Sequence, residues 1–311
     1  MSIGAGPQLT NYPYGFANGL SVRGLPIVQT SPGQIFWVYN GSALPNGGRG
    51  GSDGNTGTFQ SPFSTVAGAL LHCLAGRGDQ IFVKPGHVES ITAAAGLAMN
   101  VAGVQVIGLG AGDSRPTFNF TTANTAQIAV TANYMGFQNC IFNLTGFAAV
   151  AAGISVAAAG FTFAGNDVIL ANATNQAVLG LITTAAADGL TVDGNRFRGT
   201  TDAGTTAAMT IVGGNNIQIS NNLMYGAYTA GIGAINNITT AMLNATIDNN
   251  RINNLTASST KAMVFVAGSS GMISNNRMQI LSGSAPITGA GMSWVGGNYY
   301  AATIGQLGVL I

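Results

Sequence analysis

Carboxylates are the residues of this sequence best suited to acid–base chemistry, and the chain has only nine of them in 311 residues. Hydrolysis of a glycosidic bond uses two carboxyl groups about 5–5.5 Å apart in a retaining enzyme and about 6.5–9.5 Å apart in an inverting one. A calcium site needs about six to eight oxygen ligands, several of them usually from carboxylates. Either chemistry is possible only if the fold groups these residues. They are Asp53, Asp79, Glu89, Asp113, Asp167, Asp188, Asp193, Asp202 and Asp248.

Two histidines complete the set of residues that could act in catalysis. A Ser-His-Asp triad would have to use His72 or His87, because the chain has no other histidine. No metal-ligand spacing surrounds His72, which stands beside Cys73. His87 is close in sequence to Asp79 and Glu89, where a structural hydrogen bond is the favoured interpretation.

An asparagine returns about once every 27 residues through the second half of the chain. Apolar residues recur three positions before it and two positions after it, which is the pattern of strand, turn and strand. Repeats of about 20 to 50 residues are typical of solenoids, propellers and arrays, and the short β-branched runs favour one β-solenoid coil per repeat. The repeated residues are Asn139, Asn166, Asn195, Asn222, Asn250, Asn276 and Asn298.

Stacking gives a physical reason for asparagine at this position. Equivalent residues of successive coils lie about 4.8 Å apart. An asparagine side chain carries both a donor and an acceptor, so it can hydrogen-bond the asparagine above and below while tolerating the left-handed backbone of a tight bend. The sequence therefore predicts a structural asparagine ladder. The simpler interpretation, that asparagine is a favourable turn residue, predicts the same fold.

The repeat also sorts the acids into columns. Asp193 and Asp248 both stand two positions before a repeated asparagine, with Ser220 between them on the intervening coil. Two coils place these carboxylates about 9.6 Å apart, just beyond the inverting range. Ser274 follows in the same column and Asp167 lies in another, so no third acid joins the pair. We therefore predict no catalytic residue, no metal site and no cofactor.

Three arginines share an outward column one position after the repeated asparagine: Arg196, Arg251 and Arg277, with Leu223 between the first two. Arg251 and Arg277 lie on adjacent coils, where like charges repel unless an anion or a carboxylate intervenes. Asp248, three residues before Arg251, is expected to supply that charge. The column is a candidate interface or glycan-binding surface, with a solvated row of arginines as the alternative.

The first part of the chain does not show the repeat. Residues 1–34 contain four prolines and scattered apolar residues, which predicts an extended N-terminal arm. A short strand over 34–40 and a glycine-rich loop over 41–63 follow. Residues 35–311 are predicted to form the solenoid, and the apolar tail over 301–311 either folds over the last coil or packs against a partner.

An amphipathic helix is predicted over about 65–75. Ser64 or Thr65 can cap it, and Gly76 ends it. Because the ends of a solenoid expose unpaired strand edges, this helix is expected to cover one of them. Its apolar face consists of Val66, Leu70, Leu71 and Leu74.

Two patterns in the first third carry a resemblance to a known fold. In the first, DGN-x-GT-x3-PF-x-T-x2-A, stand Asp53, Gly54, Asn55, Gly57, Thr58, Pro62, Phe63, Thr65 and Ala69. In the second, GD-x-I-x-V-x-PG, stand Gly78, Asp79, Ile81, Val83, Pro85 and Gly86. This segment resembles the opening of right-handed parallel β-helix proteins of the pectate-lyase-like superfamily.

The resemblance implies an all-β, single-domain right-handed parallel β-helix, which we expect to have nine or ten coils, with an N-terminal arm and a capping helix. It implies little about activity, because the superfamily includes polysaccharide lyases, hydrolases, phage tailspikes and inert virion proteins.

The composition limits the partners. Only 6% of residues are charged and the net charge is +1, which gives no electrostatic footprint for nucleic acid or an anionic membrane. A net charge near zero protects poorly against association, so a homo-oligomer, most simply a trimer, is expected. The first residues show no basic region followed by an apolar one, which predicts no signal peptide. Cys73 and Cys140 are predicted to be free thiols.

The weakly charged Ala/Thr/Asn/Gly coils behind a polar arm resemble phage-encoded structural proteins. The resemblance implies a virion component, a capsid decoration or head-fibre protein, which residues 1–34 attach to other virion proteins such as the major capsid protein. A tailspike-like protein that binds or cleaves host surface glycans is the alternative. A surface adhesin is the second alternative.

Overall fold

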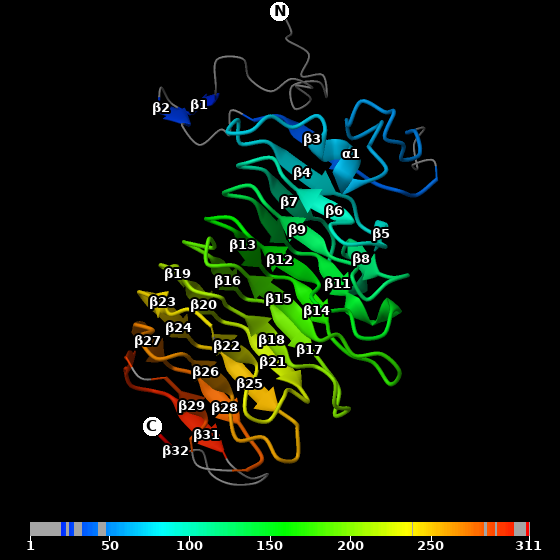
Figure 1. Cartoon of the computed structure of the whole chain (residues 1–311). Helices are drawn as coiled ribbons and strands as arrows, with labels where there is room; N and C mark the ends of the chain where they lie inside the picture. The colour runs from blue at the N-terminus through cyan, green and yellow to red at the C-terminus, as the bar shows by residue number, and fades with distance from the viewer. Residues whose placement is uncertain are drawn as a thin grey trace, which may run out of the picture.

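The chain winds into a parallel β-solenoid in which each coil contributes one strand to each of three sheets (Figure 1). This computed structural model describes residues 20–22, 25–27, 33–42, 48–237, 239–282, 285–289, 291–301 and 309–310. The all-β fold predicted from the repeat is confirmed, and the coils form one continuous stack.

The first sheet has ten strands: β3 (Ile35–Val38), β4 (Gln80–Val83), β7 (Gln105–Gly108), β10 (Gly136–Gln138), β13 (Thr162–Ala164), β16 (Thr191–Asp193), β20 (Gln218–Ser220), β24 (Ala245–Asp248), β27 (Gly271–Ser274) and β30 (Met292–Trp294).

The second sheet also has ten strands: β5 (Val88–Ile91), β8 (Thr117–Phe120), β11 (Ile141–Asn143), β14 (Asp167–Ile169), β17 (Arg196–Arg198), β21 (Leu223–Gly226), β25 (Arg251–Asn254), β28 (Arg277–Gln279), β31 (Tyr299–Ala301) and β32 (Val309–Leu310).

The third sheet has eight strands: β6 (Leu97–Met99), β9 (Ile128–Val130), β12 (Ile154–Val156), β15 (Leu179–Thr183), β18 (Ala207–Thr210), β22 (Ile235–Asn237), β26 (Met263–Phe265) and β29 (Ile287–Thr288). A small sheet pairs β19 (Gly214–Asn215) with β23 (Met242–Leu243), and two 3-10 turns span Gly112–Ser114 and Leu144–Gly146.

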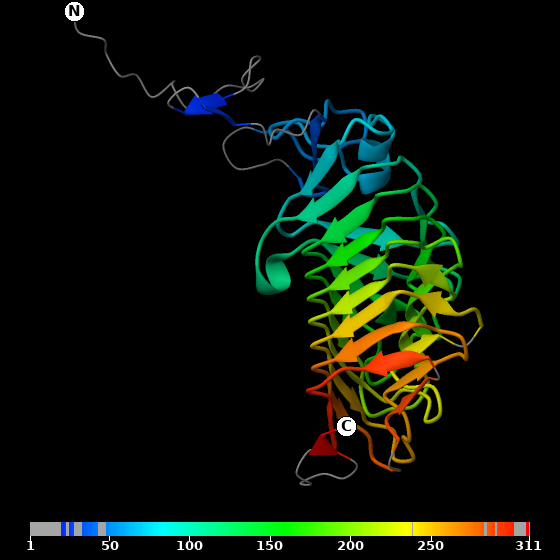
Figure 2. The ribbon, with the colours of Figure 1, turned by 90° about the vertical axis from the view of Figure 1, so that its left-hand side faces the viewer.

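Eight coils of the described chain are complete, since the third sheet has eight strands. The prediction of nine or ten coils is therefore too high for complete coils. Strand β3 begins a coil at one end, and β30 with β31 forms a partial coil at the other. Figure 2 shows the strands stacked as rungs along one axis.

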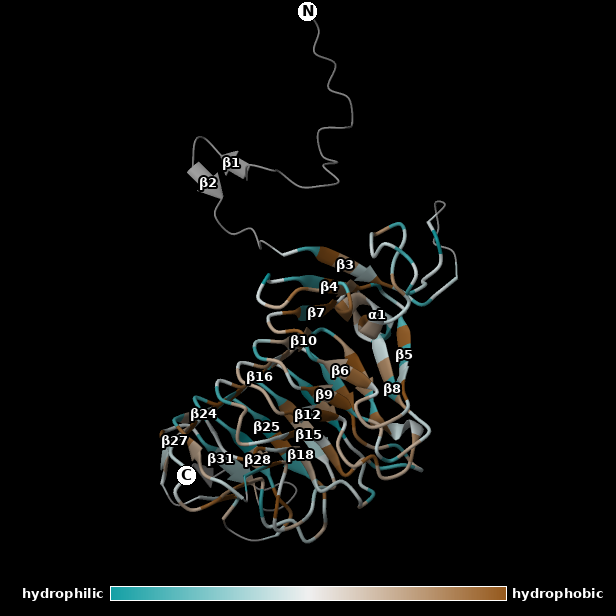
Figure 3. Ribbon diagram, turned by 45° about the horizontal axis from the view of Figure 1, so that its top comes forward, coloured by the Kyte–Doolittle hydropathy of each residue, from teal (hydrophilic) through white to brown (hydrophobic). Residues whose placement is uncertain are grey.

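Inward-facing apolar side chains fill the solenoid. In the second sheet Phe118, Phe142, Val168 and Phe197 are partners in one column and are fully buried. The rings of Phe118 and Phe142 stack with their centroids 5.4 Å apart. Hydrophobic and hydrophilic residues alternate along the stacked strands in Figure 3, as the period of two requires. This apolar interior holds the coils together.

Helix α1 (Val66–Leu70) is shorter than predicted. Thr65 is its N-cap, and its hydroxyl accepts a hydrogen bond from the backbone N–H of Gly68. The helix lies beside β3, β4 and β6 near the first coil (Figure 1). Because it ends at Leu70, the predicted apolar face is not continuous, and Leu71 and Leu74 are 86% and 57% exposed.

Antiparallel strand pairs lie near both ends of the described chain. Strands β1 (Leu20–Val22) and β2 (Leu25–Ile27) pair antiparallel within the predicted arm, and the remainder of residues 1–32 lies outside the described residues. Near the C-terminus β32 pairs antiparallel with β31. Residues 302–308, which belong to the predicted apolar tail, also lie outside them.

Both cysteines are buried and free, as predicted. Burial raises the pKa of Cys73 and of Cys140 to about 12, so both thiols stay protonated at neutral pH. Within the described part of the chain, no helix has the length and apolar character needed to cross a membrane.

Candidate functional site

Six of the seven repeated asparagines form one hydrogen-bonded row, the asparagine ladder, at the corner between the first and second sheets. Nδ2 of each residue but the last, Asn298, donates to Oδ1 of the next one, at 3.0 to 3.2 Å. The backbone N–H of those five residues donates to that same Oδ1, and Nδ2 of all six also donates to a carbonyl oxygen of the preceding coil. All six side chains are buried. The ladder consists of Asn166, Asn195, Asn222, Asn250, Asn276 and Asn298.

Asn139 is outside this row, which corrects the predicted set. Strand pairing aligns Phe137 with Phe163, so Cys140 takes the place of Asn166 on the preceding coil. The backbone N–H of Cys140 donates to Oδ1 of Asn166 at 2.9 Å. The side chain of Asn139 instead donates to two carbonyl oxygens near the end of β7.

The left-handed bend lies one position before the ladder, and not on the ladder residue as the sequence predicted. Gly194 has φ 64° and Asn221 has φ 58°. One residue thus makes the turn, and the next is free to place its amide in the row. The bend residues are Asn139, Gly165, Gly194, Asn221, Asn249, Asn275 and Gly297.

Asp193 and Asp248 stand in one outward column of the first sheet, with Ser220 between them. Each carboxylate accepts hydrogen bonds from the serine and the following asparagine of the next coil, at 2.6 to 2.8 Å. Both acids therefore link neighbouring coils, and a serine rather than a second acid lies beside each one.

Most of the other carboxylates also accept hydrogen bonds from the protein. Asp53 accepts from the backbone N–H groups of Ser64 and Thr65 and from the Thr65 hydroxyl. Partial burial alone would raise the pKa of Asp53, but these hydrogen bonds outweigh it and hold the pKa below its ordinary value. Among the nine acids, all of them in the described part of the chain, Asp113 alone has no such hydrogen bond. The acids with partners are Asp53, Asp79, Glu89, Asp167, Asp188, Asp193, Asp202 and Asp248.

The predicted arginine column lies on the outer surface of the second sheet. Arg196, Arg251 and Arg277 are all exposed, and Leu223 separates the first two as predicted. Arg251 and Arg277 are direct cross-strand partners. We name this surface the arginine face, and define it by Asp167, Arg196, Arg198, Leu223, Tyr225, Arg251, Asn253, Arg277, Gln279 and Tyr299.

Asp248 does not neutralise Arg251, so that expectation is wrong. Asp248 points outward from β24 in the first sheet, on the other side of the ladder corner from β25. Its Oδ1 is held by Ser274 and Asn275. Neither Arg251 nor Arg277 forms an ion pair within the described residues.

Asp167 is the only acid of the arginine face. Its two oxygens pair with Arg198 at 2.7 Å and with Arg115 at 3.3 Å. Five of the ten lysines and arginines of the chain, namely Arg115 and the four arginines of the face, thus lie on or beside one sheet surface. In a protein of net charge +1, this is a pronounced local excess of positive charge.

Sequence reasoning missed the second column of this face, which contains Arg198, Tyr225, Asn253 and Gln279. These residues stand two positions after the arginine column. Because side chains on a strand alternate between the two faces, the period of two would have placed them on the same surface.

The histidines have structural contacts. His72 is exposed and stacks on Phe63, with ring centroids 4.7 Å apart. His87 is fully buried, and its Nε2 lies 3.1 Å from Oε2 of Glu89. Within the described residues, no group of three or more His, Cys, Asp and Glu side chains could hold a metal ion.

Comparison with known proteins gives few matches. No family model and no curated protein matches this sequence. A rhamnogalacturonan lyase is among the solved structures that resemble it, with a TM-score of 0.46 and 13% sequence identity over 79% of this chain and 74% of that chain. A similarity this remote carries no argument about activity. The parallel β-solenoid rests on the strand pairing itself.

Proposed function

We propose that this chain is a structural protein of a bacteriophage virion, a capsid decoration or head-fibre protein, and not a glycan-cleaving enzyme. The observation that carries this proposal is the use of the carboxylates. Eight of the nine accept hydrogen bonds from the protein, and four of them, Asp167, Asp188, Asp193 and Asp248, link one coil to another or to an arginine. Acids held in this way support a shaft of fixed shape.

The asparagine ladder supports the same role. Its buried hydrogen bonds run along the solenoid from Asn166 to Asn298 and join each coil to the next. Buried and fully paired polar networks rigidify a structure, because each group would be costly to leave without a partner. A rod of this kind suits a particle that is assembled once and must persist.

The partners that we propose are further copies of the chain, as a trimer, and other virion proteins such as the major capsid protein. Residues 1–34 attach the solenoid to the particle. The arginine face offers a surface for contact between copies, because its exposed arginines, Arg196, Arg251 and Arg277, form no ion pair within the described part of the chain.

Localisation of the protein on purified particles tests this proposal. Immunogold labelling should place it on the capsid, and a variant without residues 1–34 should fold, by circular dichroism, and fail to join particles. Normal incorporation of the truncated protein would refute the role of the arm. The double variant Asp193→Asn/Asp248→Asn should leave any degradation of host polysaccharide unchanged, and loss of such an activity would refute the structural function.

The arginine face favours one other function, the binding of host surface glycans. Tyr225 and Tyr299 beside the arginines supply ring surfaces that a sugar can contact, and the amides of Asn253 and Gln279 supply donors and acceptors. The variant Arg251→Gln/Arg277→Gln should then reduce retention on immobilised host polysaccharide. A control variant, Arg49→Gln/Lys261→Gln, removes the same charge elsewhere. Equal retention by both variants would exclude this function for the face.

A further inference from the structure

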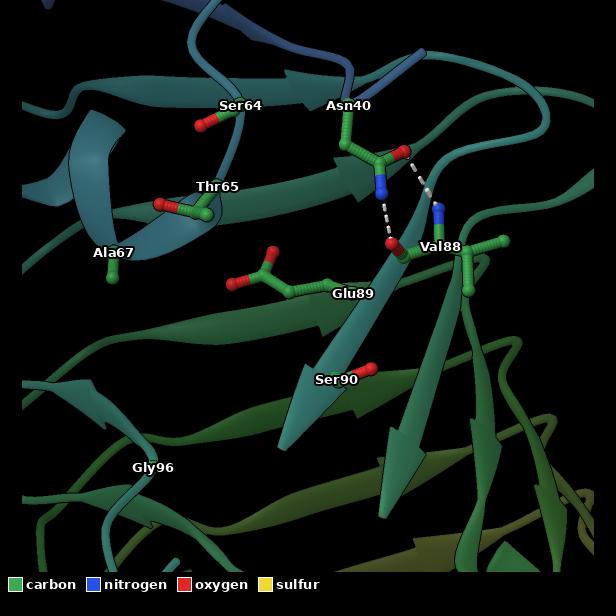
Figure 4. A pocket seen from close by; sticks show the side chains of 8 residues that line it. All are labelled: Asn40, Ser64, Thr65, Ala67, Val88, Glu89, Ser90 and Gly96. Atoms are coloured by element: carbon green, nitrogen blue, oxygen red, sulfur yellow. Dashed lines mark hydrogen bonds between the residues drawn. The ribbon is translucent and has the colours of Figure 1, made fainter. Parts of the chain in front are cut away.

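Glu89, the charged residue of the hollow beside α1, is held by the chain itself (Figure 4). Its carboxylate accepts a hydrogen bond from the backbone N–H of Val66 at 3.0 Å and lies 3.1 Å from Nε2 of His87. In the same hollow the side chain of Asn40 bonds both the N–H and the carbonyl oxygen of Val88. These contacts join the start of α1 and the end of β3 to β5, and use the polar groups of the hollow within the fold.

By contrast, the acids on the outer surface of the first sheet each keep one oxygen free. Oδ1 of Asp193 and Oδ1 of Asp248 accept the hydrogen bonds from the next coil. Oδ2 of each has no hydrogen bond and no ion pair among the described residues, and both residues are partly exposed. We name this surface the acidic face, and its outward residues include no lysine or arginine. They are Thr191, Asp193, Gln218, Ser220, Thr246, Asp248, Met272 and Ser274.

The acidic face and the arginine face have the same spacing. Both consist of parallel strands stacked about 4.8 Å apart. Asp193 and Asp248 lie two coils apart, and so do Arg196 and Arg251. Each arginine follows its aspartate by three residues around the ladder corner, so the two lie on one coil and at nearly the same height along the rod. Two ladders of equal spacing can meet coil by coil, with acids opposite arginines.

A contact between these two faces is heterologous, because they are different surfaces of the chain. Each copy would turn its arginine face toward one neighbour and its acidic face toward the other, which builds either a closed ring or an open filament. In a ring whose symmetry axis runs along the rods, equivalent coils of all copies lie at the same height. Because the two faces meet at the ladder corner, this corner then points toward the axis.

We propose that copies of the chain assemble into such a ring, with the arginine face of each copy on the acidic face of the next. Arg196 of one copy pairs with Asp193 of the next copy. Two coils further along, Arg251 pairs with Asp248 of the next copy. This interface rests on the contact between copies proposed above and adds the surface that receives the arginines. A rod of net charge +1 can associate in this way because its opposite charges lie on separate faces.

Charge reversal tests the pairing, with the mass of the full-length protein in solution measured by sedimentation velocity. Arg251→Asp should place like charges at the interface and raise the dissociation constant for self-association at least about a hundredfold. Asp248→Arg should do the same. The double variant Arg251→Asp/Asp248→Arg restores opposite charges and should recover the association of the parent protein. Because the two residues form no ion pair within one chain, recovery reports a contact between copies. A double variant as weak as the single ones would overturn the proposal.

Two further double variants give the register. Arg251→Asp/Asp193→Arg combines the arginine with an acid two coils away and should remain dissociated in a ring of parallel rods, whereas antiparallel rods would recover. Arg251→Asp/Asp202→Arg uses an exposed acid outside both faces, and as the matched control it should also remain dissociated. Circular dichroism checks that each variant folds. Recovery of association in either variant would overturn the pairing of equivalent coils.

Salt provides a test that needs no substitution. Self-association of the parent protein should weaken at least about tenfold between about 0.05 M and about 0.5 M sodium chloride, because salt screens exposed charge pairs. Association that is insensitive to salt would overturn the interface, and so would a protein that stays monomeric at every concentration. Neither result bears on attachment to particles, which the labelling experiment decides, so failure of this interface and failure of the virion role can be told apart.

Discussion

The side chain of Asn222, inside the asparagine ladder, takes part in four hydrogen bonds. Oδ1 of Asn222 accepts from both the backbone and the side chain of Asn195, while its Nδ2 donates to Asn250 and to the carbonyl oxygen of Val192. Aspartate could not donate, and glutamine is one methylene too long for the same register. Residue type and spacing are therefore set by one hydrogen-bond pattern.

Replacement of Asn222 by alanine should destabilise the protein by about 3 kcal/mol, because it leaves several buried donors and acceptors without partners. Denaturant unfolding followed by circular dichroism measures the loss. Asn253→Ala is the matched control, since Asn253 is exposed on β25 and has no hydrogen bond from its side chain among the described residues. Equal effects of the two changes would show that the ladder contributes nothing beyond an ordinary surface asparagine.

The corner between the first and second sheets is an element of two residues, a left-handed bend followed by a ladder asparagine. Asparagine and glycine share the bend position because both tolerate positive φ. At Gly194 an added Cβ would have its nearest neighbour, the backbone nitrogen of Gly165, at 4.0 Å. Any cost of substitution there must therefore come from the backbone conformation and not from a clash.

Two substitutions of Gly194 separate these effects. Gly194→Asn should change the free energy of unfolding by less than about 0.5 kcal/mol, whereas Gly194→Val should reduce it by about 1–2 kcal/mol because a β-branched residue is strained at φ 64°. Thermal unfolding of the two variants beside the parent protein gives the comparison. A valine variant as stable as the asparagine variant would contradict this account of the corner.

The sequence predicted the coil and its columns because the period survives small changes in coil length. It misplaced Asn139 because that coil has Cys140 in the ladder position and an asparagine in the bend. Spacing between asparagines cannot distinguish these two positions. The apolar column could have done so, since the misplaced register put Gly136 where Phe137 belongs, opposite Phe163.

The length of helix α1 and the contacts of Glu89 were harder to predict. Apolar periodicity continues past Leu70, but the chain turns there, which leaves Leu71 and Leu74 exposed. The hydrogen bonds of Glu89 join residues 2 and 23 positions apart, and no repeat relates those positions. The coil repeat predicts contacts only between equivalent positions of successive coils. It gives no information about contacts between segments that lie outside the repeat.

At the scale of the molecule, the ladder corner separates two faces of opposite charge. Asp193 and Asp248 project from the first sheet, while the arginines project from the second. The net charge of +1 therefore conceals a lateral charge separation along the rod. Copies packed side by side could place the basic face of one against the acidic face of the next, as electrostatic complementarity favours.

Because each coil contacts only its neighbours, the ends of a solenoid should open before its middle. Asp79 anchors the N-terminal end: it accepts hydrogen bonds from Arg77 and from the backbone N–H groups of Leu74 and Gln34. Burial alone would raise the pKa of Asp79, but these contacts outweigh it and hold the pKa below its ordinary value of 3.8.

Acid should therefore weaken this end of the molecule first. A carboxyl group whose pKa is lowered by folding stabilises the protein above its unfolded pKa, and this contribution is lost as the pH falls through the folded pKa. Hydrogen exchange by mass spectrometry should show that amide protection in β3 and β4 falls below about pH 4 before protection in β20 and β24 does. The variant Asp79→Asn should have reduced protection in β3 at neutral pH and a smaller further loss on acidification, while Asp202→Asn serves as the control. Loss of protection that is uniform along the solenoid, or unchanged by Asp79→Asn, would show that this carboxylate does not anchor the end of the rod.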